Sequence, residues 1–290
     1  MKLIPGTQAL GAKILDLDLS LGIDTAQCDQ LIQWLGEYGV LSIPQQEITP
    51  KQLKAFSGNF GELEINVAKV AQDPAIPEMM TLSNMVENGQ PLGLSDAGQD
   101  WHTDMSYSKQ IAFANILYGI KIPMRDGQPL GNTEFSNMHA AYDGLPKDIA
   151  QELEGKTITH DFNKFWEKMR REKGSSRPPL TPEQLRAKPP VSHPAIMLHP
   201  ITGKKVLYAN PGYSMRINEL NQAASDELLE YLFAHQLRPE FRYAFKWEEK
   251  SVLMWDNMGT IHNAVADYAP HEHRFIQRFQ VAASRFFPAH

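Results

Sequence analysis

The residues best suited to chemistry are His102 and Asp104, which one residue separates in the segment WHTDM. On a β-strand, residues i and i+2 project to the same face, so we expect the two side chains to converge. An imidazole nitrogen beside a carboxylate oxygen suits a divalent ion, and two histidines with one carboxylate form the open arrangement that selects non-haem iron(II) for oxygen chemistry. The pair alone is a weak signal, because a histidine hydrogen-bonded to a nearby aspartate has the same spacing.

The third ligand must come from a distant part of the chain. His262 is the natural candidate among the ten histidines, because it follows an expected strand and a turn in LMWDNMGTIH. Trp255, Asp256 and Asn257 are expected to shape that turn rather than to touch a substrate, and aspartate and asparagine are turn-forming residues. A metal site of two histidines and one aspartate is therefore expected.

The elements that must position these ligands are mostly strands. Short runs of apolar, β-branched or aromatic residues lie between turn residues. They are Val40–Ile43, Ile111–Ile120, Lys205–Tyr208, Ser251–Met254 and Phe275–Ala282. They do not alternate regularly with helices, as a doubly wound sheet would require. We therefore predict an α+β fold that is mainly β, with a double-stranded β-helix (jelly roll) core and flanking helices.

Helical spacing of apolar residues appears in a few segments. Thr25–Tyr38 is one, and Thr49–Phe60 opens with a Thr-Pro start signal. Ser225–His235 resembles an N-cap followed by an amphipathic helix. Met138–Glu154 is expected to form two short helical pieces that break at Gly144-Leu145-Pro146.

The length of 290 residues suits a single domain spanning residues 1–290. Hydrophobic residues make up 42% of the chain and charged residues 21%, so a full core can form. A charged, proline-rich stretch at residues 168–194 is expected to be either a solvated linker or a mobile lid, and a lid or insert would extend over about residues 163–194.

Charge and cysteine content exclude several classes of protein. The net charge of −6 gives no long-range attraction to nucleic acid or to an anionic membrane, so neither is an expected partner. The single cysteine, Cys28, excludes an internal disulfide framework and a cysteine zinc cluster. Neither a signal peptide nor a membrane-spanning run is apparent, so we expect a cytoplasmic protein that binds a small-molecule substrate. Assembly into a dimer or tetramer is left open.

Several motifs together resemble the taurine dioxygenase family, which includes the 2,4-dichlorophenoxyacetate dioxygenases. The motifs are WHTDMSY, GNTEFSNMHAAYDGLPKDI, HPAIMLHPITGKKVLYANPGYSMRI, LFAHQLRPEF, LMWDNMGTIHNAVADY and HRFIQRFQV. The likeness runs in the same order from about Leu10 to Phe287, and several motifs in register are a stronger signal than any one of them.

The resemblance implies an iron(II)- and 2-oxoglutarate-dependent dioxygenase that uses O₂ and releases succinate and CO₂. His102, Asp104 and His262 match the metal ligands of the family. Arg274 matches the arginine that grips the remote carboxylate of 2-oxoglutarate, which a planar guanidinium can hold with two parallel hydrogen bonds. Thr133 matches a threonine that adds a hydroxyl to the same carboxylate.

The resemblance also implies substrate-contacting residues, although it does not identify the substrate. Arg278 matches a second arginine near the co-substrate or the anionic group of the substrate, and Phe162 and Tyr107 are candidates for the pocket wall. The taurine enzymes carry a substrate-binding histidine where this chain has EINVAK, so taurine itself is in doubt, and Lys69 could supply the lost positive charge. We expect a small anionic substrate such as a sulfonate, a carboxylate or an amino-acid-like molecule.

Two other interpretations stay open at this stage. A zinc-dependent hydrolase could use the same three ligands, since two histidines and a carboxylate also serve hydrolytic zinc. That interpretation leaves Arg274 and Thr133 without a role, and the H-E-x-x-H motif of metalloproteases is missing. A non-catalytic binding protein with the same fold is the other interpretation, but such chains usually lose a ligand, and here all three are present.

Overall fold

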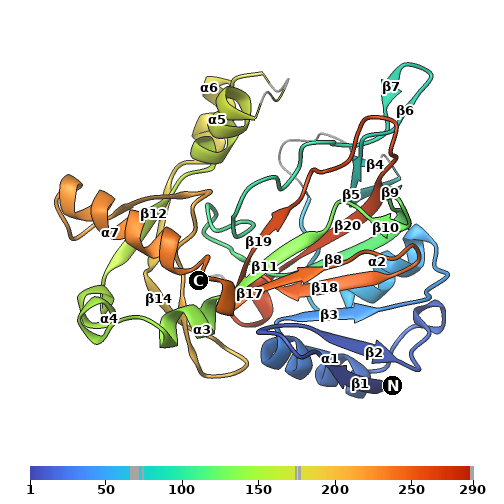
Figure 1. Cartoon of the computed structure of the whole chain (residues 1–290), viewed down its shortest axis with the longest axis horizontal. Helices are drawn as coiled ribbons and strands as arrows, with labels where there is room; N and C mark the ends of the chain where they lie inside the picture. Colours follow the sequence, from blue (N-terminus) through green and yellow to red (C-terminus); the bar gives the residue numbers. More distant parts are fainter. Residues whose placement is uncertain (66–71, 74, 174, 176–177, 288–290) are drawn as a thin grey trace.

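One large sheet forms the wall on which most of the chain is built (Figure 1). The computed structural model describes residues 1–65, 72–73, 75–173, 175 and 178–287. Among these residues, eight strands pair in the order β1-β2-β3-β18-β8-β20-β5-β4. Their bounds are β1 Lys2–Pro5, β2 Ala12–Leu15, β3 Val40–Ile43, β18 Val252–Asp256, β8 Ala112–Lys121, β20 Phe275–Ala282, β5 Ile76–Ser83 and β4 Gln72–Asp73. Every neighbouring pair is antiparallel except β2 with β3.

A second, three-stranded antiparallel sheet faces the first and completes the jelly roll. It consists of β17 (Arg242–Phe245), β11 (Thr133–Asn137) and β19 (Thr260–Ala264), in that order. Phe135 of β11 packs in one buried cluster with Leu253 and Trp255 of β18 and Ile276 of β20. The predicted double-sheet core is confirmed, and this cluster fills the space between its two layers.

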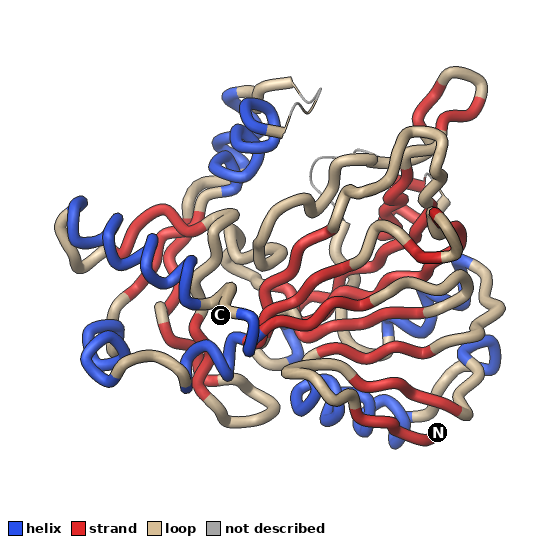
Figure 2. Tube along the Cα trace, in the orientation of Figure 1, coloured by secondary structure: helices blue, strands red, loops and turns tan. Residues whose placement is uncertain are grey.

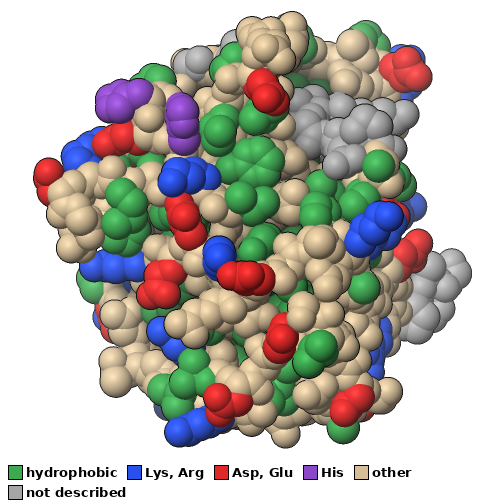
Figure 3. All heavy atoms as spheres, turned by 90° about the vertical axis from the view of Figure 1, so that its right-hand side faces the viewer, with side chains coloured by type: hydrophobic (Ala, Val, Ile, Leu, Met, Phe, Trp, Pro, Cys, Tyr) green, Lys and Arg blue, Asp and Glu red, His purple; other side chains and the backbone are tan. Residues whose placement is uncertain are grey.

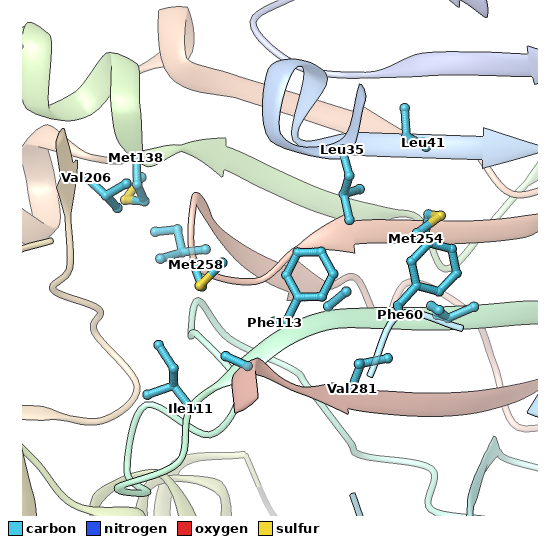
Figure 4. Close-up of a cluster of buried hydrophobic side chains, with 14 of the residues drawn as sticks. Leu35, Leu41, Phe60, Ile111, Phe113, Met138, Val206, Met254, Met258 and Val281 are labelled. Carbon is cyan, nitrogen blue, oxygen red and sulfur yellow. The ribbon is translucent and has the colours of Figure 1, made fainter. Parts of the chain in front are cut away.

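The outer face of the large sheet is covered by α1 (Thr25–Tyr38) and α2 (Pro50–Gly58). Side chains alternate between the two faces along a strand. Leu253 and Trp255 of β18 point between the sheets, so Val252 and Met254 point to the outer face, toward the helices. On that outer face, Met254 belongs to a separate buried cluster with Leu35 of α1 and Phe113 of β8, which Figure 4 shows. Both helices begin with a complete capping box, which fixes where each one starts.

The remaining elements lie mostly to one side of the sandwich (Figure 2). They are α3 Met138–Asp143, α4 Lys147–Leu153, β12 Thr157–His160, α5 Phe162–Glu172, α6 Pro182–Ala187, β13 Val191–Pro194, β14 Ile196–Leu198, β15 Lys205–Leu207, β16 Ser214–Ile217 and α7 Gln222–His235. Two hairpins, β6 (Val86–Glu87) with β7 (Gln90–Pro91) and β9 (Met124–Arg125) with β10 (Gln128–Pro129), extend from the sandwich. Three short 3₁₀ turns, Leu19–Leu21, Pro239–Phe241 and Ala283–Arg285, complete the described elements.

One expectation about the helices needs correction. Ser225 does not cap α7, because the helix begins earlier and Asn221 is its N-cap; the Ser225 hydroxyl instead accepts a hydrogen bond from the backbone N–H of Ile217.

The stretch at residues 168–194 was expected to be a solvated linker or a mobile lid. Its described residues contain the end of α5, all of α6 and strand β13.

On the face drawn in Figure 3, acidic and basic side chains are interspersed rather than gathered into a patch of one sign. Within the described part of the chain, we find no helix with both the length and the apolar character that crossing a bilayer requires.

Replacement of Phe113 by alanine tests the packing of the core behind the large sheet. The side chain is fully buried, and its ring lies 4.9 Å from that of Phe286, so its removal leaves a cavity. We expect Phe113→Ala to lower the free energy of unfolding by about 3–5 kcal/mol in urea titrations. Leu21→Ala is the control, because Leu21 is 84% exposed and should cost little; equal losses in the two variants would contradict the assigned core.

Candidate active site

Two imidazoles and one carboxylate meet where β19 passes the loop that follows β7. His102 and His262 form an isolated antiparallel bridge, in which each backbone N–H donates to the carbonyl of the other at 3.0 and 2.9 Å. Asp104 places one carboxylate oxygen 3.5 Å from Nε2 of His102 and the other 3.6 Å from Nε2 of His262. The three ligand atoms all lie within 4.8 Å of one another. The structure therefore brings the three predicted residues together.

The reason for this convergence differs from the predicted one. His102 lies in the bridge, but Asp104 is in a turn rather than on a strand, and Met105 has a φ of 57°. The expectation that both residues lie on one strand is therefore wrong. The turn, and not the two-residue period of a strand, directs the Asp104 carboxylate back toward the imidazoles.

The donor set fits a divalent ion. Separations of 3.5 and 3.6 Å are too long for good hydrogen bonds, whereas ligands at about 2.0–2.2 Å from one ion lie this far apart. Nδ1 of His102 lies 2.8 Å from the carbonyl oxygen of Asp100 and must carry the proton, so the lone pair of Nε2 faces Asp104. The ring of His262 is held by packing, with the ring of Trp255 at 4.7 Å and that of His102 at 4.1 Å.

The electrostatics keep this set in the form that binds a cation. Burial raises the pKa of Asp104, but Arg278 and the two histidines outweigh it and hold that pKa well below its ordinary value. A guanidinium nitrogen of Arg278 lies 3.2 Å from a carboxylate oxygen of Asp104. Burial, and then repulsion from His102, lower the pKa of His262 to about 4, so His262 is neutral at pH 7. A charged carboxylate and a neutral imidazole are the protonation states that a metal requires.

Asn257 holds the backbone of Asp104 in place, a role that we did not predict. Its side-chain amide accepts a hydrogen bond from the N–H of Asp104 at 3.2 Å and donates to the carbonyl of Asp104 at 2.8 Å. The same amide also donates to the carbonyl of Ala112, at the start of β8. We expected Asn257 only to shape the turn before His262. Because it pairs with a residue 153 positions away, no local pattern in the sequence could reveal this contact.

Gly212 is another residue that sequence reasoning did not identify. A Cβ atom at this position would lie 2.7 Å from Cβ of His102 and 3.1 Å from the ring of Phe165. A side chain here would displace either the imidazole or α5. The glycine therefore allows the loop before β16 to pass directly behind His102.

Arg274 and Thr133 are buried, at 6% and 3% exposure. Nε of Arg274 has no hydrogen-bond partner, and no carboxylate of the described residues forms an ion pair with this guanidinium. Burial lowers the pKa of Arg274, and Tyr268 opposes that shift. Thr133 accepts a hydrogen bond from the indole N–H of Trp247 at 3.0 Å, which leaves its own hydroxyl proton free to donate. A buried cation without an anion is costly, so this position suits a bound carboxylate.

A cavity of about 610 Å³ opens onto two of the three candidate ligands, His102 and Asp104. His102, Asp104 and Arg278 line it, together with Tyr107 and Phe162, whose rings stand 4.7 Å apart. The volume is within the range of about 300–1,000 Å³ that is typical of small-molecule sites. Arg274, Thr133 and His262 are not among the lining residues. The predicted Lys69 falls outside the described residues.

Parts of the segment at residues 163–194 also line the cavity. Phe165 and Trp166 of α5 and Lys188, just after α6, reach it. Lys188 donates to the hydroxyl of Ser108 at 3.2 Å, and its ammonium lies 5.6 Å from the ring centre of Tyr107. The segment is therefore a wall of the cavity, and its movement as a lid stays a prediction.

A second group of possible ligands, His139, His199 and Asp256, lies at the turn before β19. Nε2 of His199 is 2.9 Å from a carboxylate oxygen of Asp256. The other carboxylate oxygen of Asp256 accepts from the backbone N–H of Met258 at 3.0 Å. The hydrogen bond from Met258 helps to shape the turn, the role expected for Asp256, while Nε2 of His139, Nε2 of His199 and the first carboxylate oxygen have no hydrogen-bond partner among the described residues.

Comparison with known proteins agrees with this geometry. Residues 2–280 match the family described as "Taurine catabolism dioxygenase TauD, TfdA family". Pentalenolactone F synthase of Streptomyces avermitilis is 31% identical over 287 residues, which cover 95% of this chain and 91% of that protein. The alpha-ketoglutarate-dependent 2,4-dichlorophenoxyacetate dioxygenase of Cupriavidus pinatubonensis is 30% identical over 262 residues, 87% of each chain.

Solved structures show the same likeness. AAD-2 in complex with Mn(II) and N-oxalylglycine superposes with a TM-score of 0.80 at 26% identity, over 97% of this chain and 96% of that one. A taurine dioxygenase from Burkholderia xenovorans gives a TM-score of 0.78 at 27% identity, over 97% of this chain and 89% of that one. The jelly roll and the elements beside it are therefore shared with these enzymes.

Asn257→Ala tests how the Asp104 backbone is held. The change removes several buried hydrogen bonds and leaves their partners unpaired, so we expect a loss of about 1–3 kcal/mol in the free energy of unfolding of the metal-free protein. Weaker metal binding should accompany this loss. Gln222→Ala, on the exposed start of α7, is the control. If metal affinity in Asn257→Ala equals that of the control, Asn257 does not position Asp104.

Proposed function

The chain belongs to the taurine catabolism dioxygenase TauD, TfdA family, and we propose that its own reaction is the hydroxylation of a C–H bond in an anionic organic substrate. The enzyme is an oxidoreductase of the 2-oxoglutarate-dependent class. One oxygen atom of O₂ enters the substrate as a hydroxyl group. The other enters the co-substrate, which leaves as succinate and CO₂. The convergence of His102, Asp104 and His262 is the observation that carries the proposal.

The cofactors of this class are Fe(II), 2-oxoglutarate and O₂. Bound Fe(II) supplies the activation of O₂, and oxidation of 2-oxoglutarate supplies two of the electrons that reduce it. We assign His102, Asp104 and His262 as the metal ligands, because their donor atoms converge in a buried pocket without good mutual hydrogen bonds. Three protein ligands leave positions open for co-substrate and oxygen, as in other non-haem iron oxygenases.

Arg274 and Thr133 are assigned to the remote carboxylate of 2-oxoglutarate. The buried guanidinium of Arg274 has an unpartnered Nε, and the hydroxyl of Thr133 keeps a proton to donate. A dicarboxylate would supply the missing anion, and the planar guanidinium favours a carboxylate over other anions. These two residues bind and orient the co-substrate, while the walls of the cavity exclude water from it.

Arg278, Tyr107 and Phe162 are assigned to the substrate. Arg278 reaches the cavity beside Asp104 and, once a metal neutralises that carboxylate, could attract the anionic group of a sulfonate, carboxylate or amino-acid-like substrate or a carboxylate of the co-substrate. The rings of Tyr107 and Phe162 supply an apolar wall for the rest of the molecule. Lys69 stays a candidate for a second positive group at the site.

The two other interpretations are weaker. A zinc hydrolase would need neither the buried Arg274 nor Thr133, and the family is one of oxidoreductases. A non-catalytic protein would not be expected to keep three converging ligands together with an unpaired buried guanidinium. A cytoplasmic location and assembly into a dimer or tetramer stay predictions.

Asp104→Ala and His102→Ala should each abolish succinate formation, because each removes one metal ligand from the buried site. Succinate release and Fe(II) binding are measured for both variants, and far-UV circular dichroism monitors the fold. His271→Ala is the matched control, because His271 is an exposed histidine outside the site. Normal turnover by either ligand variant would show that the metal assignment is wrong.

Arg274→Ala should act on the co-substrate rather than on the metal. Loss of a charged, paired hydrogen bond corresponds to about 1.5–3 kcal/mol, so the 2-oxoglutarate concentration for half-maximal succinate release should rise about tenfold to a hundredfold. Metal affinity without co-substrate should stay near that of the unmodified enzyme. Arg285→Ala is the control, since Arg285 forms an exposed ion pair with Asp29. An unchanged requirement for 2-oxoglutarate would remove Arg274 from the co-substrate site.

A further inference from the structure

The main chain of Asp100 forms hydrogen bonds with His102 and with the residue that follows His262. Its carbonyl oxygen lies 2.8 Å from Nδ1 of His102 and accepts that proton. Its own N–H donates to the side-chain oxygen of Asn263, next to His262 in β19, at 2.8 Å. The position of the Asp100 peptide therefore sets how the His102 ring is turned and which of its nitrogens faces Asp104.

The backbone of Asp100 adopts a conformation that requires support. Its φ is 112°, in a region that residues with a side chain rarely occupy. Such a conformation persists only where the surrounding contacts over-determine it. The carboxylate of Asp100 supplies two of these contacts, because one oxygen accepts from the N–H of Trp101 at 2.9 Å and the other forms an ion pair with Lys168.

Lys168 belongs to α5, the helix that forms part of the cavity wall. Residues three apart on a helix share a face, and Phe165, one turn before Lys168, places its ring 5.1 Å from that of His102. Phe162 and Trp166, on the same helix, line the cavity. Helix α5 therefore touches the metal centre at two points, the His102 ring and the Asp100 carboxylate, and touches the substrate space with its aromatic side chains.

We propose that Asp100 is a positioning residue for the metal ligand His102, and that its ion pair with Lys168 couples the docking of α5 over the cavity to the affinity of the metal centre. The inference rests on the proposed function, because it takes His102 to be a metal ligand. When α5 is docked, Lys168 holds the Asp100 carboxylate and the peptide keeps its strained conformation. When the pair is broken, the carbonyl is free to turn away from Nδ1, and the orientation of the ring is lost.

Coupling of this kind acts in both directions. A substrate that packs against Phe162, Phe165 and Trp166 favours the docked helix and so strengthens metal binding, and a bound metal favours the docked helix in turn. The side chains of the pair are only 28% and 17% exposed, so breaking it is expected to cost some stability whether or not a metal is bound. Its further effect on the metal centre distinguishes positioning from a merely structural role.

The test uses Co(II) as the probe in anaerobic titrations of the complete metal-free chain. The variants are Lys168→Met, Asp100→Asn, the double variant and Lys168→Arg. Asp100→Asn keeps a residue that tolerates positive φ but removes the charge. Arg171→Met is the matched control, because Arg171 lies on the same helix, is 77% exposed and pairs with Glu167 instead.

We expect Lys168→Met and Asp100→Asn each to weaken Co(II) binding by about tenfold and to alter the ligand-field absorption of the bound ion, as loss of an outer-shell contact typically does. The Co(II) affinity of the double variant should be no lower than that of the single variant with the lower affinity, because both changes break the same interaction. Lys168→Arg should restore affinity to within about twofold, since its guanidinium can also pair with the carboxylate. The unfolding midpoints of the metal-free variants, measured beside that of Arg171→Met, report the separate cost to stability.

Three results would overturn the proposal. They are Co(II) affinity and absorption in Lys168→Met equal to those of the unmodified chain, additive losses in the double variant, and a loss in Lys168→Met that Lys168→Arg does not repair. Failure of the metal assignment on which the proposed function rests looks different, because the unmodified chain itself would then show no Co(II) binding that depends on Asp104. The two failures are thus separated within one set of titrations.

Discussion

The site depends on a buried carboxylate that lies between two imidazoles and a guanidinium. Asp104 stays charged although burial opposes it, because Arg278, His102 and His262 surround it. The separations between its oxygens and the two imidazoles exceed those of good hydrogen bonds, so the protein alone leaves these polar groups poorly satisfied. A divalent ion would satisfy all three ligands at once. The arrangement is therefore better understood as a metal centre than as a structural ion pair.

The jelly roll makes this arrangement rigid. His262 lies on β19 of the small sheet, and the bridge between His262 and His102 fixes the two imidazoles relative to each other. Asn257 anchors the Asp104 backbone to β8 of the large sheet, so the third ligand is held by the opposite layer. The ligands thus come from distant parts of the chain but are held by the two packed sheets and not by flexible loops alone. The proposed co-substrate site follows the same logic, because the buried guanidinium of Arg274 has an Nε without a hydrogen-bond partner.

Local sequence patterns were sufficient for elements with clear caps or periodicity. The bounds of α1, β3 and β20 agree with the predictions, and the capping box at Thr49 marks the start of α2. Local patterns failed where a distant contact decides the structure. Asp104 sits in a turn held by Asn257, and the hydroxyl of Ser225 serves β16 instead of capping α7. Helix α5 was missed among its charges, although its apolar residues at positions 162, 165, 166 and 169 follow helical spacing.

The proposed site would let one ferrous ion, held by His102, Asp104 and His262, bind 2-oxoglutarate directly. Visible absorption spectroscopy of the metal-free protein under anaerobic conditions, with Fe(II) and 2-oxoglutarate added singly and together, tests this binding. We expect a weak charge-transfer band that appears only when both are present and saturates at one Fe(II) per chain. If both bind and no such band forms, the co-substrate does not coordinate the iron, and the proposed active site is wrong.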